Sequence, residues 1–168
     1  ESGKSDLRSI LGAQPGITIG TGENGNAFGD RYIIRGHEAR SDVFIDGLRD
    51  PGMTTRESFA VDHIEITKGP SSTFAGRGST GGAINSVTKQ PNSDKDFTEI
   101  GLGFGTEDYR RATLDTNKVI NDRASVRLNL LDASETVPDR EPADKSRRGL
   151  LLSGKFKATD KLDLSADY

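Results

Sequence analysis

The segment AGRGSTGGAINSVTKQP occupies residues 75–91 and contains the spacing G-x-G-x-x-G, at Gly76, Gly78 and Gly81. That spacing holds a dinucleotide pyrophosphate where a buried strand leads into the first glycine and a helix begins at the last. Here Pro70 and the serines after it predict a turn that opens a short helix, and residues 83–89 predict a strand. This context is the reverse of a nucleotide-binding loop, and without a following Gly-Lys-Ser/Thr a Walker-type loop does not fit. The glycines therefore require another explanation.

The composition of the 168 residues excludes several classes of protein. A net charge of −3 is unlike the basic surface of a nucleic-acid-binding protein, so no nucleic-acid partner is expected. The chain has no cysteine, and its two histidines, His37 and His63, lie far apart in the sequence. We therefore expect no disulfide, no metal site built from protein ligands and no cofactor held by them. No nucleophile, histidine base and acid occur at a recognisable catalytic spacing, so we do not expect an enzyme.

Hydropathy leaves a membrane location open. Apolar residues make up 32% of the chain, and no apolar run approaches the ~18 residues that a membrane-spanning helix needs. The strands of a membrane barrel, however, alternate lipid-facing and lumen-facing residues, so their mean hydropathy stays low. Residues 1–10, ESGKSDLRSI, lack the apolar core of a secretory signal, which indicates a cytosolic protein or one whose beginning has been removed.

Besides the helix after Pro70, two short helices are expected in the first half of the chain. Leu7 and Leu11 have helical spacing with Ile10, Ser5 is available as N-cap, and Gly12 and Pro15 end the pattern. Further along, Thr54 and Glu57 form the pattern of a capping box, which predicts a short helix running through Phe59.

Short strands are expected between these helices and after them. The extended patterns lie at residues 17–21, 31–36, 43–50 and 63–67. Asp46 and Gly47 interrupt the third of these patterns with a strong tight-turn signal. In the fourth, Ile64 and Ile66 share one face. The first half therefore predicts a small sheet with helices and long, glycine-rich loops.

The pattern changes after a polar stretch at residues 89–96, KQPNSDKD. From there, apolar and polar residues alternate with period two in five segments, at residues 97–105, 109–118, 123–134, 147–159 and 161–168. Each is about 8–12 residues long, which is the length of a membrane-barrel strand. The apolar face of these segments consists of Ile100, Leu102, Phe104, Ala112, Leu114, Val126, Leu128, Leu130, Leu150, Leu152, Phe156, Leu162 and Leu164.

The connections between the five segments differ in length. The second and fourth, VIND and ATD, are short, whereas the third, ETVPDREPADKS at residues 135–146, is long and charged. If the first strand starts on the inner side, the short turns lie inside and the long loop outside, as in outer-membrane barrels. Half of a soluble β-sandwich shows the same alternation and stays an alternative on the strand pattern alone.

Three segments resemble the TonB-dependent outer-membrane receptors. They are IRG at residues 34–36, VFIDGLRD at residues 43–50 and, above all, IEITKGPSSTFAGRGSTGGAINSVTKQP at residues 64–91. The last is similar to the end of the family's plug domain, where it runs into the first barrel strand. Residues 35–59 are most similar to the Fiu-like receptors, which take up iron chelated by catecholate siderophores.

The resemblance implies a two-part fold. Residues 1–91 would form an α+β plug domain, with a small mixed sheet and short helices. Residues 92–168 would form about five antiparallel strands of a transmembrane β-barrel. Family barrels have about 22 strands around a plugged lumen. Five strands cannot close, so the chain is expected to be a fragment of such a receptor.

The resemblance also implies a function and partners. The full protein would import a ferric siderophore across the outer membrane of a Gram-negative bacterium, with iron carried as the chelate and the plug gating the lumen. Its partners would be outer-membrane lipid and TonB with ExbB and ExbD, reached through a TonB box upstream of Glu1 that is absent here. Other siderophores, haem or cobalamin are alternative ligands. A soluble β-rich binding module is the alternative from another class.

Three sets of site residues follow from the resemblance. A charge lock between plug and barrel would use Arg35 and Lys68, with Glu65 as a local partner of Lys68. Capture of the anionic, aromatic chelate would use two outward plug loops, with Asn24, Asn26, Phe28, Arg49, Met53 and Arg56, and Arg40 as a weaker candidate. Close packing of the plug would require the glycines Gly36, Gly69, Gly76, Gly78, Gly81 and Gly82.

Overall fold

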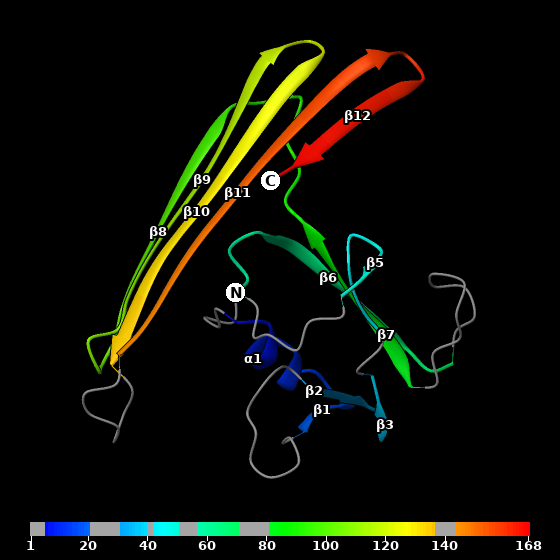
Figure 1. Ribbon diagram of the computed structural model, residues 1–168, viewed down its shortest axis with the longest axis vertical. Helices are drawn as coiled ribbons and strands as arrows, with labels where there is room; N and C mark the ends of the chain where they lie inside the picture. The colour runs from blue at the N-terminus through cyan, green and yellow to red at the C-terminus, as the bar shows by residue number, and fades with distance from the viewer. Residues whose placement is uncertain (1–5, 21–30, 40–41, 51–56, 71–80, 137–143) are drawn as a thin grey trace. The chain divides into compact units, whose positions relative to one another are not determined.

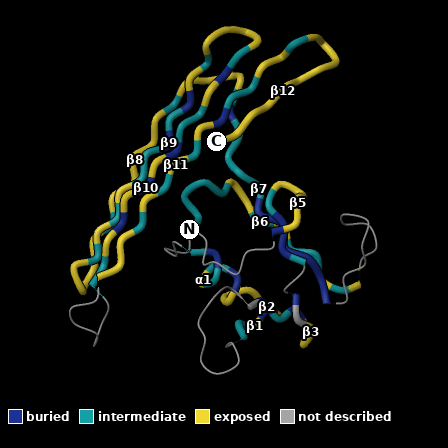
Figure 2. The backbone as a smooth tube through the Cα atoms, viewed as in Figure 1, coloured by how far each residue is buried: buried dark blue, intermediate teal, exposed yellow. Residues whose placement is uncertain are grey.

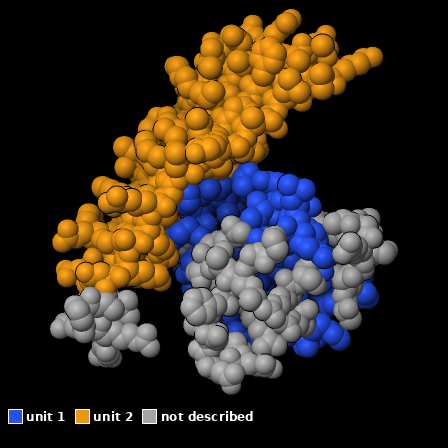
Figure 3. All heavy atoms as spheres, in the orientation of Figure 1, with its two compact units in different colours: residues 1–88 blue, residues 89–168 orange. Residues whose placement is uncertain are grey.

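The computed structural model describes residues 6–20, 31–39, 42–50, 57–70, 81–136 and 144–168. The chain divides into two compact units, Glu1–Thr88 and Lys89–Tyr168, shown in different colours in Figure 3. The first unit is mixed α/β and the second is a single antiparallel sheet.

The first unit opens with helix α1, Leu7–Gly12 (Figure 1). Its N-cap is Asp6, whose carboxylate accepts a hydrogen bond from the Ser9 backbone N–H at 2.8 Å. The sequence expectation of Ser5 as N-cap is therefore wrong by one residue, which matters little because Asp and Ser cap equally well. Leu7 and Leu11 are buried. No helix in the described part of the chain combines the length and hydropathy needed to cross a membrane.

A three-stranded antiparallel sheet follows the helix. It consists of β1 (Ile17–Gly20), β2 (Arg31–Ile34) and β3 (His37–Glu38) in that order. The turn between β2 and β3 consists of Arg35 and Gly36, with φ of 50° and 84°. A two-residue hairpin turn with both φ values positive matches the twist of the strands on either side.

A second sheet has the order β5-β4-β7-β6. Its strands are β4 (Val43–Ile45), β5 (Leu48–Arg49), β6 (Val61–Lys68) and β7 (Gly82–Thr88). The expected tight turn joins β4 to β5, with φ of 49° at Asp46 and 77° at Gly47. Strand β7 pairs parallel to β4 and antiparallel to β6, so the sheet is mixed as expected.

The short helix expected through Phe59 is absent from residues 57–60. Glu57 forms an isolated antiparallel bridge with Asp6 instead, and a turn follows it. The backbone of Glu57 therefore pairs with Asp6 instead of forming a helical turn. Thr54, the proposed cap, and the helix predicted after Pro70 lie outside the described residues.

One apolar cluster joins these elements. It unites Leu7, Leu11, Ile17, Tyr32, Ile34, Ala39, Val43 and Ile84, with Ile19, Ile64 and Ile66 packed against it. Leu11, Ile34 and Ile84 are completely buried. The core of the unit is thus assembled by side chains from the helix and from both of its sheets.

The second unit is a five-stranded meander. Its strands are β8 (Phe97–Phe104), β9 (Arg110–Asn121), β10 (Ala124–Thr136), β11 (Asp144–Thr159) and β12 (Leu162–Asp167), each paired antiparallel to the next. The register places Ile100 opposite Leu114, Leu114 opposite Leu130, and Leu130 opposite Leu150. The apolar residues expected to share a face therefore do so.

The polarity of this sheet is reversed relative to a water-soluble one. On the apolar face Ile100, Leu102 and Phe104 are 71%, 68% and 78% exposed. On the other face Asp115, Asn117, Asn129 and Ser153 are buried, the last completely. Figure 2 shows the resulting alternation along the strands. A sheet with hydrocarbon outside and polar groups inside is typical of a barrel wall in lipid.

The ends of the strands refine the expected boundaries. Two-residue turns join β9 to β10 and β11 to β12, and lie at the same end of the sheet (Figure 1). Strands β10 and β11 extend beyond the predicted limits, because Glu135 forms ion pairs with Lys145 at 3.2 Å and Arg147 at 3.1 Å. Cross-strand charge pairs of this kind stabilise a ladder beyond its apolar part. The predicted loop at residues 135–146 is correspondingly shorter, and its remainder lies outside the described residues.

Candidate functional site

The glycine-rich segment enters strand β7 rather than a helix. A Cβ at Gly81 would lie 2.6 Å from His37 Cβ and 2.8 Å from the Ile34 carbonyl oxygen. A Cβ at Gly82, where φ is 141°, would lie 2.1 Å from the Thr67 carbonyl oxygen. Only glycine allows these approaches. A strand in place of the helix removes the nucleotide-binding interpretation, because β7, and not a helix N-terminus, begins at Gly82.

The other proposed packing glycines divide into two groups. Gly36 and Gly69 lie at turns, with φ of 84° and 104°. Gly76 and Gly78 lie outside the described residues.

The turn between β4 and β5 is tied to the far end of strand β7. Asp46 accepts hydrogen bonds from the Thr88 backbone N–H at 2.8 Å and from the Thr88 hydroxyl at 2.7 Å. Gly47 N–H donates to Asn85 Oδ1 at 3.0 Å, and Asn85 Nδ2 donates to Glu65 Oε2 at 2.8 Å. The VFIDGLRD motif therefore connects three strands of the mixed sheet through polar side chains.

The structure does not pair Glu65 with Lys68. Residues three apart on a strand point to opposite faces, so their side chains diverge. Lys68 Nζ donates to the Pro15 carbonyl oxygen at 2.6 Å, whereas Glu65 binds Asn85. Arg35 is exposed in the β2–β3 turn, and its backbone N–H donates to the Gly16 carbonyl at 2.9 Å. In the described part of the chain, neither Arg35 nor Lys68 forms an ion pair with a carboxylate.

Of the predicted ligand residues, the structure describes Arg49. Its guanidinium lies over the Phe44 ring, 6.0 Å from the centroid, next to Leu48, which is 76% exposed. The remaining ligand candidates, Asn24, Asn26, Phe28, Arg40, Met53 and Arg56, lie outside the described residues.

A small acidic cluster surrounds His63 on strand β6. His63 Nδ1 lies 2.8 Å from Asp62 Oδ2, and its Nε2 lies 3.7 Å from Glu65 Oε1. The hydrogen bond to Asp62 is the main cause that raises the pKa of His63 above its ordinary 6.5. Within the described residues, no group of His, Asp and Glu side chains has the arrangement of a metal site.

The inner face of the second unit carries a polar network that was not predicted from the sequence. Its centre is Asp115 on β9, whose side chain is 8% exposed. Arg127 donates to Asp115 Oδ1 through Nε and to Oδ2 through Nη2, both at 2.8 Å. Lys89 Nζ also donates to Oδ2 at 2.8 Å. The Asn129 amide, with its NH2 group turned toward the carboxylate, lies 3.2 Å from both oxygens.

The segment that precedes β8 is held by the same face. Arg127 Nη1 donates to the Gln90 carbonyl at 2.9 Å. Asn117 accepts from the Asn92 N–H at 2.9 Å and donates to the Asn92 and Lys95 carbonyls at 2.9 Å and 2.8 Å. The sequence shows polar residues at alternate positions of two adjacent strands. It does not show what these residues bind, because only the pairing of β9 with β10 brings them together.

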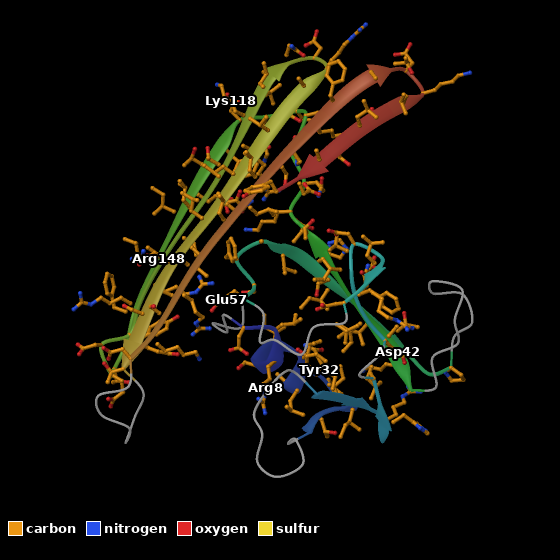
Figure 4. The ribbon with its side chains drawn as sticks, in the orientation of Figure 1. Arg8, Tyr32, Asp42, Glu57, Lys118 and Arg148 are labelled. Atoms are coloured by element: carbon orange, nitrogen blue, oxygen red, sulfur yellow. The ribbon has the colours of Figure 1, made fainter. Side chains whose placement is uncertain are left out.

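Two further ion pairs mark the two ends of the sheet (Figure 4). Lys118 binds Asp96, which also accepts the Val119 N–H at 2.7 Å. The Lys118 hydrogen bond is the main cause that lowers the pKa of Asp96 below its ordinary value. Near the opposite end, Arg148 Nε donates to Asp132 Oδ2 at 3.0 Å on the exposed apolar face.

Comparison with known proteins agrees with both units. Residues 1–83 match the family model of the TonB-dependent receptor plug domain. The probable TonB-dependent receptor BfrD of Bordetella pertussis is 44% identical over 166 residues, which is 95% of this chain and 22% of that protein.

Two solved structures share the fold. The siderophore receptor PiuA of Acinetobacter baumannii matches with a TM-score of 0.90, and the closed form of the ferric-catecholate import receptor Fiu of Escherichia coli K12 with 0.88. Both are 34% identical and cover 99% of this chain, which covers 24% of each. The chain therefore spans about a quarter of these receptors' length. It belongs to the TonB-dependent receptors, and consists of a plug domain and the first strands of the wall that follows it.

Proposed function

We propose that the full-length protein is an outer-membrane transporter that imports a ferric siderophore, and that the siderophore is a catecholate. The observation that carries the proposal is the reversed polarity of strands β8–β12, which follow a plug domain directly. An exposed apolar face is stable only against hydrocarbon, and a buried polar face needs polar contents. Both conditions are met in a plugged barrel.

Two of the related receptors support a siderophore as the ligand, and one of them supports a catecholate. Fiu is described as a ferric-catecholate import receptor and PiuA as a siderophore receptor. Ferric catecholates are anionic and aromatic, so an exposed Arg49 next to the apolar Leu48 suits them. Iron is the cargo in this proposal and stays bound to its chelator, so the chain supplies no ligand atoms to the metal.

Transport requires force from elsewhere, because the outer membrane has no ATP supply. We propose that TonB, with ExbB and ExbD, pulls on the chain upstream of Glu1. The plug is suited to movement because its apolar core is small and one end of its mixed sheet is closed by hydrogen bonds from a turn. Segments with few buried apolar contacts open at low free-energy cost.

Arg35 and Lys68 would lock the plug to the barrel. Both are exposed, and both carry charges that no described carboxylate neutralises. Acidic residues of barrel strands beyond this chain would complete the ion pairs. Lysine at position 68 forms a weaker lock than arginine would, because an ammonium cannot bind a carboxylate in the two-point manner of a guanidinium.

The alternative ligands would also be imported by a TonB-dependent receptor. Haem, cobalamin or a non-catecholate siderophore would use the same plug and wall with different loops. A soluble β-rich module is disfavoured, because Ile100, Leu102 and Phe104 are each more than two-thirds exposed. Such a face would favour aggregation in water.

Iron-limited growth tests the proposal. A receptor-deficient strain that carries the full-length gene is fed one ferric chelator at a time. We expect rescue by catecholates and none by hydroxamates. Rescue by hydroxamates alone would refute the catecholate assignment, and no rescue by any iron chelate would refute siderophore import. A variant that lacks the TonB box serves as the control for energised uptake.

A further inference from the structure

We propose that residues 89–96, the linker that follows the plug, form a junction clamp by binding to the inner face of the barrel wall. When TonB pulls on the plug, unravelling would stop at this clamp. This inference rests on the proposed transport function, but its test measures mechanical lifetime and needs no siderophore. It assigns positioning roles to Asp115, Arg127 and Asn117.

The clamp begins with a part-buried charge cluster around the buried carboxylate of Asp115. The Asp115 carboxylate accepts hydrogen bonds at 2.8 Å from the guanidinium of Arg127, on the neighbouring strand, and from the ammonium of Lys89, in the linker (residues 89–96). The side chains of Asp115, Arg127 and Lys89 are 8%, 13% and 21% exposed. The Arg127 guanidinium also lies 5.1 Å from the centroid of the Phe97 ring, at the start of β8. Removing the charge of one of these side chains would leave the charges of the other two incompletely neutralised in a site that is largely shielded from water.

The remaining contacts hold the linker by its backbone. Asn117 accepts a hydrogen bond from the Asn92 N–H and donates to the Asn92 and Lys95 carbonyls. Arg127 donates to the Gln90 carbonyl. At the end of the linker, the Asp96 carboxylate accepts hydrogen bonds from the Lys118 ammonium and from the Val119 N–H. A backbone held at successive points cannot slide along the wall, so the clamp fixes register as well as position.

Adjacent residues of the chain are held by different units. Thr88 is bound by Asp46 within the plug, and Lys89 is bound by Asp115 on the wall. Force applied to the plug that breaks the Asp46–Thr88 contact is therefore transmitted to the Lys89–Asp115 contact at the next residue. The Asp46 contacts are exposed, whereas those of Asp115 are part-buried, so the plug contact is the one expected to open first.

Single-molecule pulling on the full-length receptor in a lipid bilayer tests the clamp. A cysteine introduced at Ser5, as the only reactive thiol, carries the handle. We expect unravelling to pause after roughly 290 Å of chain has been released, the extended length of residues 5–88. The lifetime of this pause at constant force is the measured quantity.

Two substitutions probe the clamp from opposite sides. Lys89→Gln removes the linker cation and leaves the Asp115–Arg127 pair intact, so the wall should still fold. Asp115→Asn removes the centre of the cluster. We expect the lifetime of the pause to fall about tenfold or more in each, because buried charge pairs are broken. Asp132→Asn is the matched control, since it removes an exposed carboxylate bound to one arginine on the opposite face of the wall.

The outcomes separate the clamp from the transport proposal. A shorter pause in Lys89→Gln and Asp115→Asn, with Asp132→Asn unchanged, supports the clamp whatever the receptor imports. Equal lifetimes in all variants, or no pause near residue 89 in the wild type, would overturn it. The growth test with ferric chelators decides the transport function independently.

Discussion

Asp46 and Thr88, 42 residues apart in the sequence, are joined by two hydrogen bonds to the same carboxylate, at 2.8 Å and 2.7 Å. Asp46 occupies the first position of a tight turn, and Thr88 is the last residue of β7. A turn residue thereby closes one end of the mixed sheet. The contact reinforces the short parallel pairing of β4 with β7, which spans three residue pairs.

We predict that Asp46→Asn weakens this end of the sheet by about 1 kcal/mol, because one charged acceptor is lost while the left-handed turn is tolerated. The Thr88 amide should exchange with deuterium roughly fivefold faster in the full-length receptor. Arg8→Gln, which alters a side chain on helix α1 of the same unit, is the control and should leave this amide unchanged. Unaltered exchange at Thr88 in Asp46→Asn would contradict the role of the contact.

Gly82→Ala should prevent correct assembly of the plug. A Cβ at this position would lie 2.1 Å from a backbone oxygen of β6 and would require a φ of 141°. Backbone strain alone costs about 1–3 kcal/mol, and the clash adds to it. Gly154→Ala is the matched control, because a Cβ there meets nothing within 4 Å. Protease resistance of the plug in purified receptor measures the effect; equal resistance in both variants would show that the close approach can relax.

The substitution Ile100→Lys should impair insertion into the outer membrane. Ile100 is 71% exposed on the apolar face, and a cation facing lipid costs about 2–4 kcal/mol at the bilayer centre. Glu99→Lys, one residue away on the opposite face, is the control and should insert normally. The heat-modifiable mobility of the folded barrel on gels reports insertion. Equal yields of the two variants would argue for a water-facing sheet.

The His63 pKa gives a pH dependence with a defined sign. The carboxylate of Asp62 raises the folded-state pKa of His63 above 6.5. The resulting stabilisation is fully present below the unfolded pKa and is lost as the pH rises through the higher folded value. In Asp62→Asn the pKa of His63 should fall, which an NMR titration of the imidazole measures. An unchanged titration would mean that Asp62 is not the cause.

Neutralising the proposed lock should separate binding from transport. In Arg35→Gln/Lys68→Gln we expect ferric-chelate binding to persist while energised uptake falls, because the residues proposed to capture the chelate are untouched. Binding to whole cells at low temperature and iron uptake at growth temperature measure the two steps. Arg8→Gln, on helix α1, is a control for loss of a plug cation. Uptake equal to that of the wild type would refute the charge lock.

Much of the secondary structure could be predicted because it depends on local patterns. Alternation of Val126, Leu128 and Leu130 with polar residues defines one strand whatever lies around it. The Asp46-Gly47 turn needs only two residues that accept positive φ. The N-cap of α1 and the ends of β10 and β11 were misplaced, since a cap is chosen by one hydrogen bond and a strand end by cross-strand ion pairs.

The candidate sites were harder to predict because they depend on which strands pair. Glu65 and Lys68 are close in sequence, yet they bind partners from different elements, Asn85 and Pro15. The Asp115 network could not be read from the sequence, since Lys89 and Arg127 are separated by 37 residues of unrelated pattern.

The sequence by itself determined the polarity of each strand face, because polarity follows from the side chain present at each residue. The tertiary structure decided which positions only glycine can occupy, because the close approaches at Gly81 and Gly82 are made by residues of other strands. The tertiary structure decided where the polar side chains of the inner face are directed. Strand pairing sets the register, and register places a buried carboxylate within reach of the linker. A charge removed from water must be compensated by groups that arrive from elsewhere in the chain, and only the fold brings them there.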